Sequence, residues 1–310
     1  MGSLELETQR LLAASMASNT HATYKRGVES FDSFRSKLGL DIKWPAPIDH
    51  IIAYIASLSI ECKSPSTINT YISALAYIHK LNGWQDPTDN FIIKKLKEGC
   101  KRQDKRSDCR RPITLPILRQ LSQLLQGLCQ STFESSLFRA AFLLAFFGFL
   151  RVGEFTVTSK NGDVSNILSR GDIIINHGPP EFMEATIRFS KTDQYGESTT
   201  LNFTRGTDPL LCPVNAMIDY LRVRPSTEGP LFIHFGKDPM TRYQFDSMLK
   251  RGIKAMGLCP TLFSPHSFRI GAATSAAVSG IPMDIIKSIG RWQSSAVKLY
   301  VRPHMILPLP

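Results

Sequence analysis

The stretch from Ser264 to Arg302 concentrates the side chains best suited to hold and attack a phosphodiester. Ser264 is expected to cap a helix with Pro265 in its first position. His266 and Arg269, three residues apart, then share one face of the first turn. A helix N-terminus attracts anions, so this imidazole and guanidinium would make a phosphate-binding cradle there. The pair alone fits equally well a capped helix with two surface polar residues.

The rest of the stretch predicts three short consecutive helices. Gly280 and Gly290 each read as the end of one helix. Ser294 or Ser295 is expected to cap the last helix, with Tyr300 inside it. A helical tyrosine is ordinarily a packing residue, so Tyr300 taken alone indicates no chemistry.

The combination of these residues with an upstream set carries a family resemblance. The residues are His266-x-x-Arg269, Gly290-Arg291-Trp292, Tyr300, Arg151-x-x-Glu154 and Lys191. Together they resemble the tyrosine recombinases, also called the phage-integrase family, from about Arg111 to Arg302 and more loosely in the N-terminal half. The strings His-Ser-Phe-Arg-Ile-Gly-Ala-Ala-Thr, Ser-Lys-Thr-Asp-Gln and Gly-Arg-Trp are most similar to the eukaryotic branch carried by Crypton-like and DIRS-like mobile elements.

The resemblance implies a fold that is mainly α-helical with a small antiparallel β-sheet, in two domains. A chain of 310 residues already exceeds the usual single-domain size. We expect a helical core-binding domain over residues 1–100, a basic linker over 101–112 and a catalytic domain over 113–310. The catalytic domain would contain strands near 171–176, 184–189 and 198–203.

The resemblance also implies a DNA breaking and rejoining reaction that uses neither a cofactor, ATP nor a metal ion. The expected catalytic side chains are Arg151, Glu154, Lys191, His266, Arg269, Trp292 and Tyr300. Arg151 and Arg269 would clamp the phosphate, and His266 would assist proton transfer or orientation. Lys191, in a hairpin turn, would protonate the leaving 5′-oxygen while Tyr300 attacks. A second 5′-hydroxyl would then displace the tyrosine, giving strand exchange.

One catalytic position stays open between two neighbours. Relatives place a histidine or tryptophan nine residues before the nucleophile, and that position is Arg291, whereas Trp292 stands at eight. We favour Trp292, with its indole N–H donated to the scissile phosphate. Arg291 would then be a further phosphate contact, and the alternative is that Trp292 is a core residue.

Arg151 follows the apolar run of a helix predicted over 133–155. A charge at the end of a buried helix is costly unless it is paired or meets a ligand. Glu154, three residues on, can orient it.

The N-terminal half contains an internal echo, Thr20-x-x-Thr23-Tyr24 and Thr67-x-x-Thr70-Tyr71. Threonines at a helix start are usually caps, but hydroxyls there also bind DNA phosphates. The DNA-binding residues expected from this echo and the basic segment after Lys94 are Thr20, Thr23, Tyr24, Lys25, Thr67, Thr70, Tyr71, Lys101, Arg102, Lys105, Arg106, Arg110 and Arg111. The basic segment reads alternatively as a solvated charge run, and it could double as a nuclear import signal.

A net charge of +11 and a pI near 9.5 indicate an acidic partner, here double-stranded DNA. The most apolar run, 140–150, is too short to span a bilayer, so no membrane association is expected. The resemblance implies a homo-oligomer on DNA, dimer to tetramer, although only residues 301–310 follow Tyr300. Localisation would be nuclear in a eukaryote and cytoplasmic otherwise.

Two rival interpretations remain at this level. A type IB topoisomerase uses a similar set of arginine, lysine, histidine and tyrosine to relax DNA. A non-catalytic DNA-binding protein derived from a mobile element would retain the fold without the chemistry. The target DNA sequence cannot be derived, because groove contacts depend on geometry.

Overall fold

A computed structural model describes residues 2–189 and 197–306. The chain divides into two compact units, an N-terminal unit that ends at Ser107 and a C-terminal unit that begins at Asp108. The division lies inside the segment 101–112 that was predicted as a linker. The last helix of the N-terminal unit continues to Gln103, so the first residues of that segment are helical.

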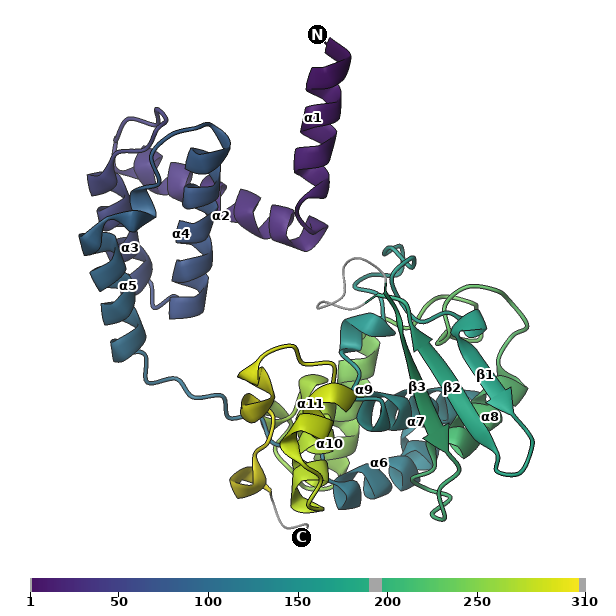
Figure 1. Cartoon of the computed structure of the whole chain (residues 1–310). Coiled ribbons are helices and arrows are strands. Elements are labelled where there is room, and N and C mark those ends of the chain that lie inside the picture. The colour runs from purple at the N-terminus through teal and green to yellow at the C-terminus, as the bar shows by residue number, and fades with distance from the viewer. Residues whose placement is uncertain (1, 190–196, 307–310) are drawn as a thin grey trace. The chain divides into compact units, whose positions relative to one another are not determined.

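The N-terminal unit consists of helices (Figure 1). They are α1 (Gly2–Ala14), α2 (Ser18–Lys37), α3 (Ile48–Ile60), α4 (Pro65–Leu81) and α5 (Phe91–Gln103). Helix α2 packs along α4, and α3 packs along α5. The core contains Phe31, Ile51, Tyr54, Ile72 and Ile93, all at most 1% exposed. Burial of these apolar side chains holds the unit together.

The threonines of the N-terminal echo are not the helix caps. Helix α4 is capped by Ser64, whose hydroxyl accepts from the Thr67 backbone N–H at 3.0 Å. The hydroxyls of Thr23 and Thr70 instead donate to carbonyls one turn back. The capping interpretation was therefore wrong, because Ser64 already occupies the non-helical position before Pro65 that a cap requires.

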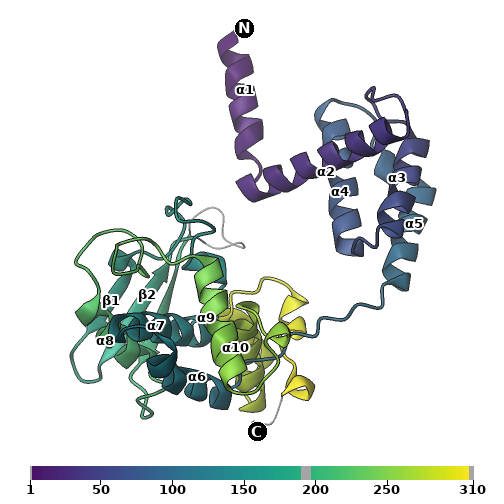
Figure 2. The ribbon, with the colours of Figure 1, turned by 180° about the vertical axis from the view of Figure 1, so that it is seen from behind.

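The C-terminal unit combines helices with a three-stranded antiparallel sheet of order β1-β2-β3 (Figure 1). The strands are β1 (Ile173–Asn176), β2 (Phe182–Ile187) and β3 (Thr199–Thr204). The helices are α6 (Leu115–Leu128), α7 (Thr132–Phe147), α8 (Pro213–Val223), α9 (Arg242–Ala255), α10 (His266–Val278) and α11 (Met283–Ile289). In both views the sheet lies on one side of this unit and α10 on the other, with α7 between them (Figure 2). A mainly helical chain with one small antiparallel sheet confirms the predicted fold class.

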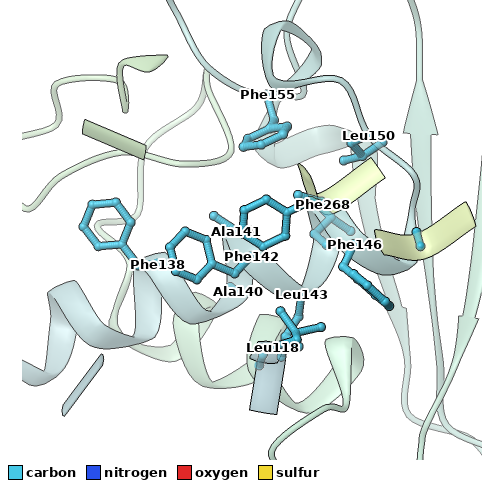
Figure 3. Packing of buried hydrophobic residues seen from close by; sticks show 14 of the residues in the cluster. Leu118, Phe138, Ala140, Ala141, Phe142, Leu143, Phe146, Leu150, Phe155 and Phe268 are labelled. Atoms are coloured by element: carbon cyan, nitrogen blue, oxygen red, sulfur yellow. The ribbon is translucent and has the colours of Figure 1, made fainter. Parts of the chain in front are cut away.

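Helix α7 forms the centre of this unit because it is apolar on nearly all sides. The ring of Phe142 lies 5.1 Å from the rings of both Phe245 on α9 and Phe268 on α10. Figure 3 shows Phe142 and Phe268 side by side, with Phe155 nearby. The aromatic packing fixes α10, which carries His266 and Arg269, against a rigid base.

Helix α7 is shorter than predicted. It ends at Phe147, with Gly148 as its C-cap and Phe149 in the left-handed region at φ 49°. A separate 3₁₀ turn, Val152–Glu154, follows. Apolar residues continue to Phe155, but the backbone turns away from the helix axis, and periodicity alone does not report such a turn. Arg151 therefore lies in the loop before the 3₁₀ turn and not on a helix.

Helix α10 is held against the chain that enters the C-terminal unit. The backbone N–H of Ile113 donates to the Ser267 carbonyl at 3.0 Å, and that of Arg111 donates to the Leu262 carbonyl at 2.7 Å. A Cβ on Gly271 would lie 1.8 Å from the Ile113 carbonyl oxygen. Only glycine permits this close approach of backbone to backbone. Within the described ranges, no helix is both long and apolar enough to cross a membrane.

Candidate active site

Helix α10 starts one residue later than the sequence suggested. His266 is its first residue and Pro265 stands at the cap position with helical backbone angles. The Ser264 hydroxyl has no hydrogen-bond partner among the described residues, so the predicted serine cap was wrong. The hydroxyl of Ser267 instead accepts from the Ser264 backbone N–H at 3.1 Å, and no side chain caps the helix. His266 and Arg269 nevertheless occupy the first turn, as their spacing predicted.

Arg269 is completely buried at the centre of the site. Its guanidinium donates to the carbonyl oxygens of Phe149 and Gly290, which terminate α7 and α11. The guanidinium carbon also lies 4.0 Å from the ring centroid of Trp292. These contacts join two helix ends through one cation, a geometry that satisfies buried carbonyls and retains the positive charge.

Glu154 joins the two remaining arginines of the site. Its buried carboxylate accepts from the Arg151 backbone N–H at 2.9 Å and from the Arg151 guanidinium at 3.1 Å. The Arg291 guanidinium donates to the same carboxylate at 2.9 Å. Arg269 lies near enough to Glu154 to interact with it electrostatically, so three guanidinium groups share one carboxylate and the cluster has an excess of positive charge that an anion would neutralise.

The electrostatics of the cluster reflect this excess. Burial, together with the nearby charges of Arg151 and Arg291, lowers the pKa of Arg269 to about 9. Burial likewise lowers the pKa of Arg291. A bound phosphate would favour the charged form of each guanidinium, so the cluster is suited to phosphate binding.

Tyr300 lies beside this cluster. Its ring centroid lies 4.8 Å from those of His266 and Trp292, and 5.5 Å from the Arg269 guanidinium carbon. Tyr300 follows the 3₁₀ turn Ser295–Leu299 and does not lie inside a helix, which corrects the prediction. This 3₁₀ turn is five residues long, and Ser294 caps its start.

Trp292 and Arg291 face different parts of the site. The Trp292 ring is 7% exposed and packs between Arg269 and Tyr300, and its indole N–H has no partner among the described residues. A buried donor without a partner is costly, so a ligand oxygen there would stabilise the site. Arg291, at φ 55°, instead extends to Glu154.

Gly290 makes the position of Trp292 possible. A Cβ on Gly290 would lie 1.7 Å from a ring atom of Trp292. Gly290→Ala is therefore expected to displace the indole and to destabilise the C-terminal unit by about 1–3 kcal/mol. Trp292 fluorescence and denaturant unfolding measure both effects. Gly127→Ala in α6, where nothing lies within 4 Å, is the matched control, and equal behaviour of the two variants would contradict the prediction.

His266 is held in its neutral form. Burial lowers the pKa of His266 to about 4, assisted by the positive charges of Arg110 and Arg269. Between pH 4 and 6.5 the unfolded chain consequently binds more protons than the folded chain, so stability rises with pH across that window. We expect His266→Gln to flatten this rise in the free energy of unfolding. Parallel pH profiles for the two proteins would count against it.

The structure brings together seven predicted site residues: Arg151, Glu154, His266, Arg269, Arg291, Trp292 and Tyr300. Lys191 lies outside the described residues. Arg110, expected only as a DNA-binding residue of the linker, lies near enough to Tyr300 and His266 to interact with them electrostatically. Sequence reasoning missed the contacts of Asp108, Thr274 and Arg302. The repeated Asp-x-Arg spacing at 104–106 and 108–110 is a sequence signal for Asp108 alone.

The expected DNA-binding residues of the N-terminal unit lie on several of its helices. Lys25 on α2 and Lys101 and Arg102 on α5 are exposed, as is Lys105 after α5. Tyr24 packs toward Tyr77, with their ring centroids 5.6 Å apart. The half-buried Arg111 donates to the Met305 carbonyl. Within the described ranges, no group of three or more histidine, cysteine or acidic residues could hold a metal ion.

Comparisons with known proteins identify the fold. No protein-family model matches the sequence, and no curated protein matches it significantly. Among solved structures, the chain is similar to the Tn1549 transposon integrase in complex with transposon right-end DNA, at 16% identity and a TM-score of 0.61 over 97% of this chain and 94% of that one. It is also similar to a lambda integrase dimer bound to a COC′ core site, at 15% identity and a TM-score of 0.61, over 97% and 94% of the two chains.

A third similar structure is the XerH site-specific recombinase bound to its palindromic difH substrate. Here the identity is 14% and the TM-score 0.65, over 92% of this chain and 76% of that one. The fold of this chain is therefore that of the tyrosine recombinases and integrases.

Proposed function

We propose that this chain is a site-specific DNA recombinase that cleaves and rejoins DNA through a 3′-phosphotyrosyl intermediate and exchanges strands. The observation that carries the proposal is a cluster of three guanidinium groups, of which two bind the Glu154 carboxylate and the third, Arg269, lies 5.5 Å from the ring centroid of Tyr300. The similar integrases and recombinase, each solved with DNA, support the same reading.

The cluster supplies what a DNA phosphodiester needs in order to react. The phosphate charge repels nucleophiles, so catalysis requires cations at the non-bridging oxygens. Arg151 and Arg269 serve as these cations. The Trp292 indole N–H donates to a non-bridging oxygen, whereas Arg291 fixes Glu154 and thereby Arg151. The unpartnered indole N–H of Trp292 and the bond from Arg291 to Glu154 support Trp292 as the residue at the position that sequence spacing left open.

Each strand transfer is a balanced exchange of phosphodiester bonds. The Tyr300 oxygen bonds to phosphorus while the bond to the 5′-oxygen breaks, and the phenol proton leaves with help from the neutral imidazole of His266. Lys191 protonates the departing 5′-oxygen. A second 5′-hydroxyl then attacks phosphorus and releases the tyrosine. One ester replaces another in each step, so the reaction draws on neither ATP nor a metal ion.

Double-stranded DNA is the proposed partner, held by both units. The basic residues of segment 101–111 and the hydroxyl and aromatic groups on α2 and α4 would contact its backbone. The net charge of +11 favours this partner. We propose assembly on DNA as a dimer to tetramer, as the lambda integrase dimer on its core site suggests.

The proposed biological setting is a eukaryotic mobile element of the Crypton-like or DIRS-like branch, with action in the nucleus. This proposal depends on the residue strings around Lys191, His266 and Arg291. Inverted repeats beside the gene would supply the cognate DNA site. Nuclear accumulation of the tagged full chain, lost when Lys101, Arg102, Lys105 and Arg106 are neutralised, would support it, and cytoplasmic retention of the tagged chain would oppose it.

A nicked substrate tests the function as a whole. The test substrate is DNA that carries the inverted repeats and a nick just beyond the cleavage site. Cleavage releases the short fragment with the 5′-hydroxyl, so the reaction cannot reverse and the chain should stay covalently attached to the DNA 3′-phosphate. DNA binding without any adduct would instead identify a non-catalytic binder. Relaxation of supercoiled plasmid without the site, in the absence of added metal, would identify topoisomerase chemistry.

A further inference from the structure

The chain that joins the two units carries the same short motif twice, Asp104-Lys-Arg106 and Asp108-Cys-Arg110. In each copy the aspartate accepts from the backbone N–H of the arginine at 3.2 Å. The same carboxylate also accepts from the guanidinium Nε of that arginine, at 2.6 and 2.8 Å. Each motif is therefore a local clip in which the aspartate sets the direction of the arginine.

The two clips attach to different units. Arg106 donates to the Cys62 and Lys63 carbonyls between α3 and α4, both at 3.3 Å. The second clip is bound by Arg302, which lies two residues after Tyr300. The Arg302 guanidinium donates to the Asp108 carboxylate and to the carbonyls of Asp108 and Arg110, the last at 3.1 Å. Ser107 alone separates the two clips along the chain.

The segment that carries Tyr300 is held from a second side by α10. The Thr274 hydroxyl donates to the Tyr300 carbonyl and accepts from the Arg302 backbone N–H, both at 3.0 Å. The Arg302 side chain is only 12% exposed. Asp108 lies between two guanidinium groups, which hold the pKa of its carboxyl well below the usual range, so it stays ionised at working pH.

The contacts of Arg302 with Asp108 and of Thr274 with the backbone at Tyr300 and Arg302 hold the segment that carries Tyr300. It follows a short 3₁₀ turn and is not enclosed in a helix that would fix its position. A nucleophile displaced by about 1 Å loses on the order of 10²-fold in rate, because the reacting atoms must meet in line. The Arg302–Asp108 contact, two residues from Tyr300, can set the distance between the nucleophile and phosphorus without itself contacting the phosphate.

We infer that Asp108 is a positioning residue for Tyr300: through Arg302 it binds the segment carrying the nucleophile to the segment that enters the C-terminal unit. The inference rests on the proposed strand-cleavage function.

The tie itself is tested without DNA. Hydrogen–deuterium exchange of amides 299–306 should rise about 10-fold or more in Asp108→Ala, because the Arg302 guanidinium loses its carboxylate partner and keeps only backbone carbonyls. Asp104→Ala breaks the matching clip in the N-terminal unit and should leave exchange at 299–306 unchanged. Unchanged exchange in Asp108→Ala, or an equal rise in both variants, would overturn the inference.

Its effect on chemistry is tested on the nicked substrate at saturating DNA. Asp108→Ala should slow single-turnover adduct formation by about 10- to 100-fold, with the dissociation constant for DNA within about two-fold. Asp108→Glu, which keeps the carboxylate, should recover most of the rate, and Asp104→Ala should retain it. Adduct formation by Asp108→Ala at the native rate would overturn the inference. If the native chain forms no adduct, the proposed function fails. The hydrogen–deuterium exchange experiment then decides by itself whether Asp108 anchors the segment that carries Tyr300.

Discussion

Tyr300→Phe should abolish covalent attachment to the nicked substrate, with a loss of at least about 10⁴-fold in rate. The substitution removes one oxygen and leaves a ring that can still pack against His266 and Trp292, each 4.8 Å away between ring centroids. The fold and the affinity for DNA should therefore persist. Adduct formation on a denaturing gel, together with mass-spectrometric identification of the modified peptide, measures the effect.

The matched control is Tyr243→Phe. Tyr243 lies on α9 in the same unit and is 78% exposed. This variant should form the adduct at the native rate. An adduct on a residue other than Tyr300, or one that survives in Tyr300→Phe, would remove the proposed nucleophile.

Arg269→Lys should lower the rate of adduct formation by about 10²- to 10³-fold, the loss associated with removing one preorganised donor to a reacting group. The guanidinium bridges the Phe149 and Gly290 carbonyls while it stacks on Trp292. A lysine ammonium lacks this planar fork and cannot reproduce all three contacts. At least one buried carbonyl should lose its partner, which lowers stability by about 1–3 kcal/mol.

Single-turnover kinetics and denaturant unfolding separate the two consequences. Arg222→Lys on α8, whose side chain is 74% exposed, is the control and should change neither quantity. A stable Arg269→Lys protein that cleaves at the native rate would show that Arg269 is only a structural cation. The same conclusion would follow if Arg269→Lys were less stable than the native protein but cleaved at the native rate at a low temperature where it stays folded.

Much of the architecture follows from local patterns in the sequence. Alternating apolar residues predict the strands, and the observed β2 has every second side chain buried. The apolar run around Phe142 predicts a buried helix, and α7 is that helix. The end of α7 could not be predicted, since apolar residues continue past Gly148 while the backbone turns at Phe149. Periodicity reports which residues are buried but not where the axis ends.

In the candidate site too, some features follow from local sequence and others depend on distant contacts. The spacing of His266 and Arg269, and of Arg151 and Glu154, is short, so a single turn of backbone determines that each pair lies together. The directions of the Arg291 and Trp292 side chains depend on the left-handed backbone at Arg291, and that conformation is stabilised by contacts to Glu154 and Arg269 from other elements. Spacing from Tyr300 alone points to Arg291.

The sequence by itself determined the chemical identity of the candidate site, which consists of arginines, a histidine, a tryptophan and a tyrosine, and it placed His266 and Arg269 together on the first turn of a helix. Only the tertiary structure decided that Arg269 joins two helix ends and that Asp108 meets Arg302, 194 residues further along the chain. Local conformation depends on neighbours in sequence, whereas these contacts form only after α7, α10 and α11 have packed. Their partners are set by the burial of distant apolar faces, which no local motif records.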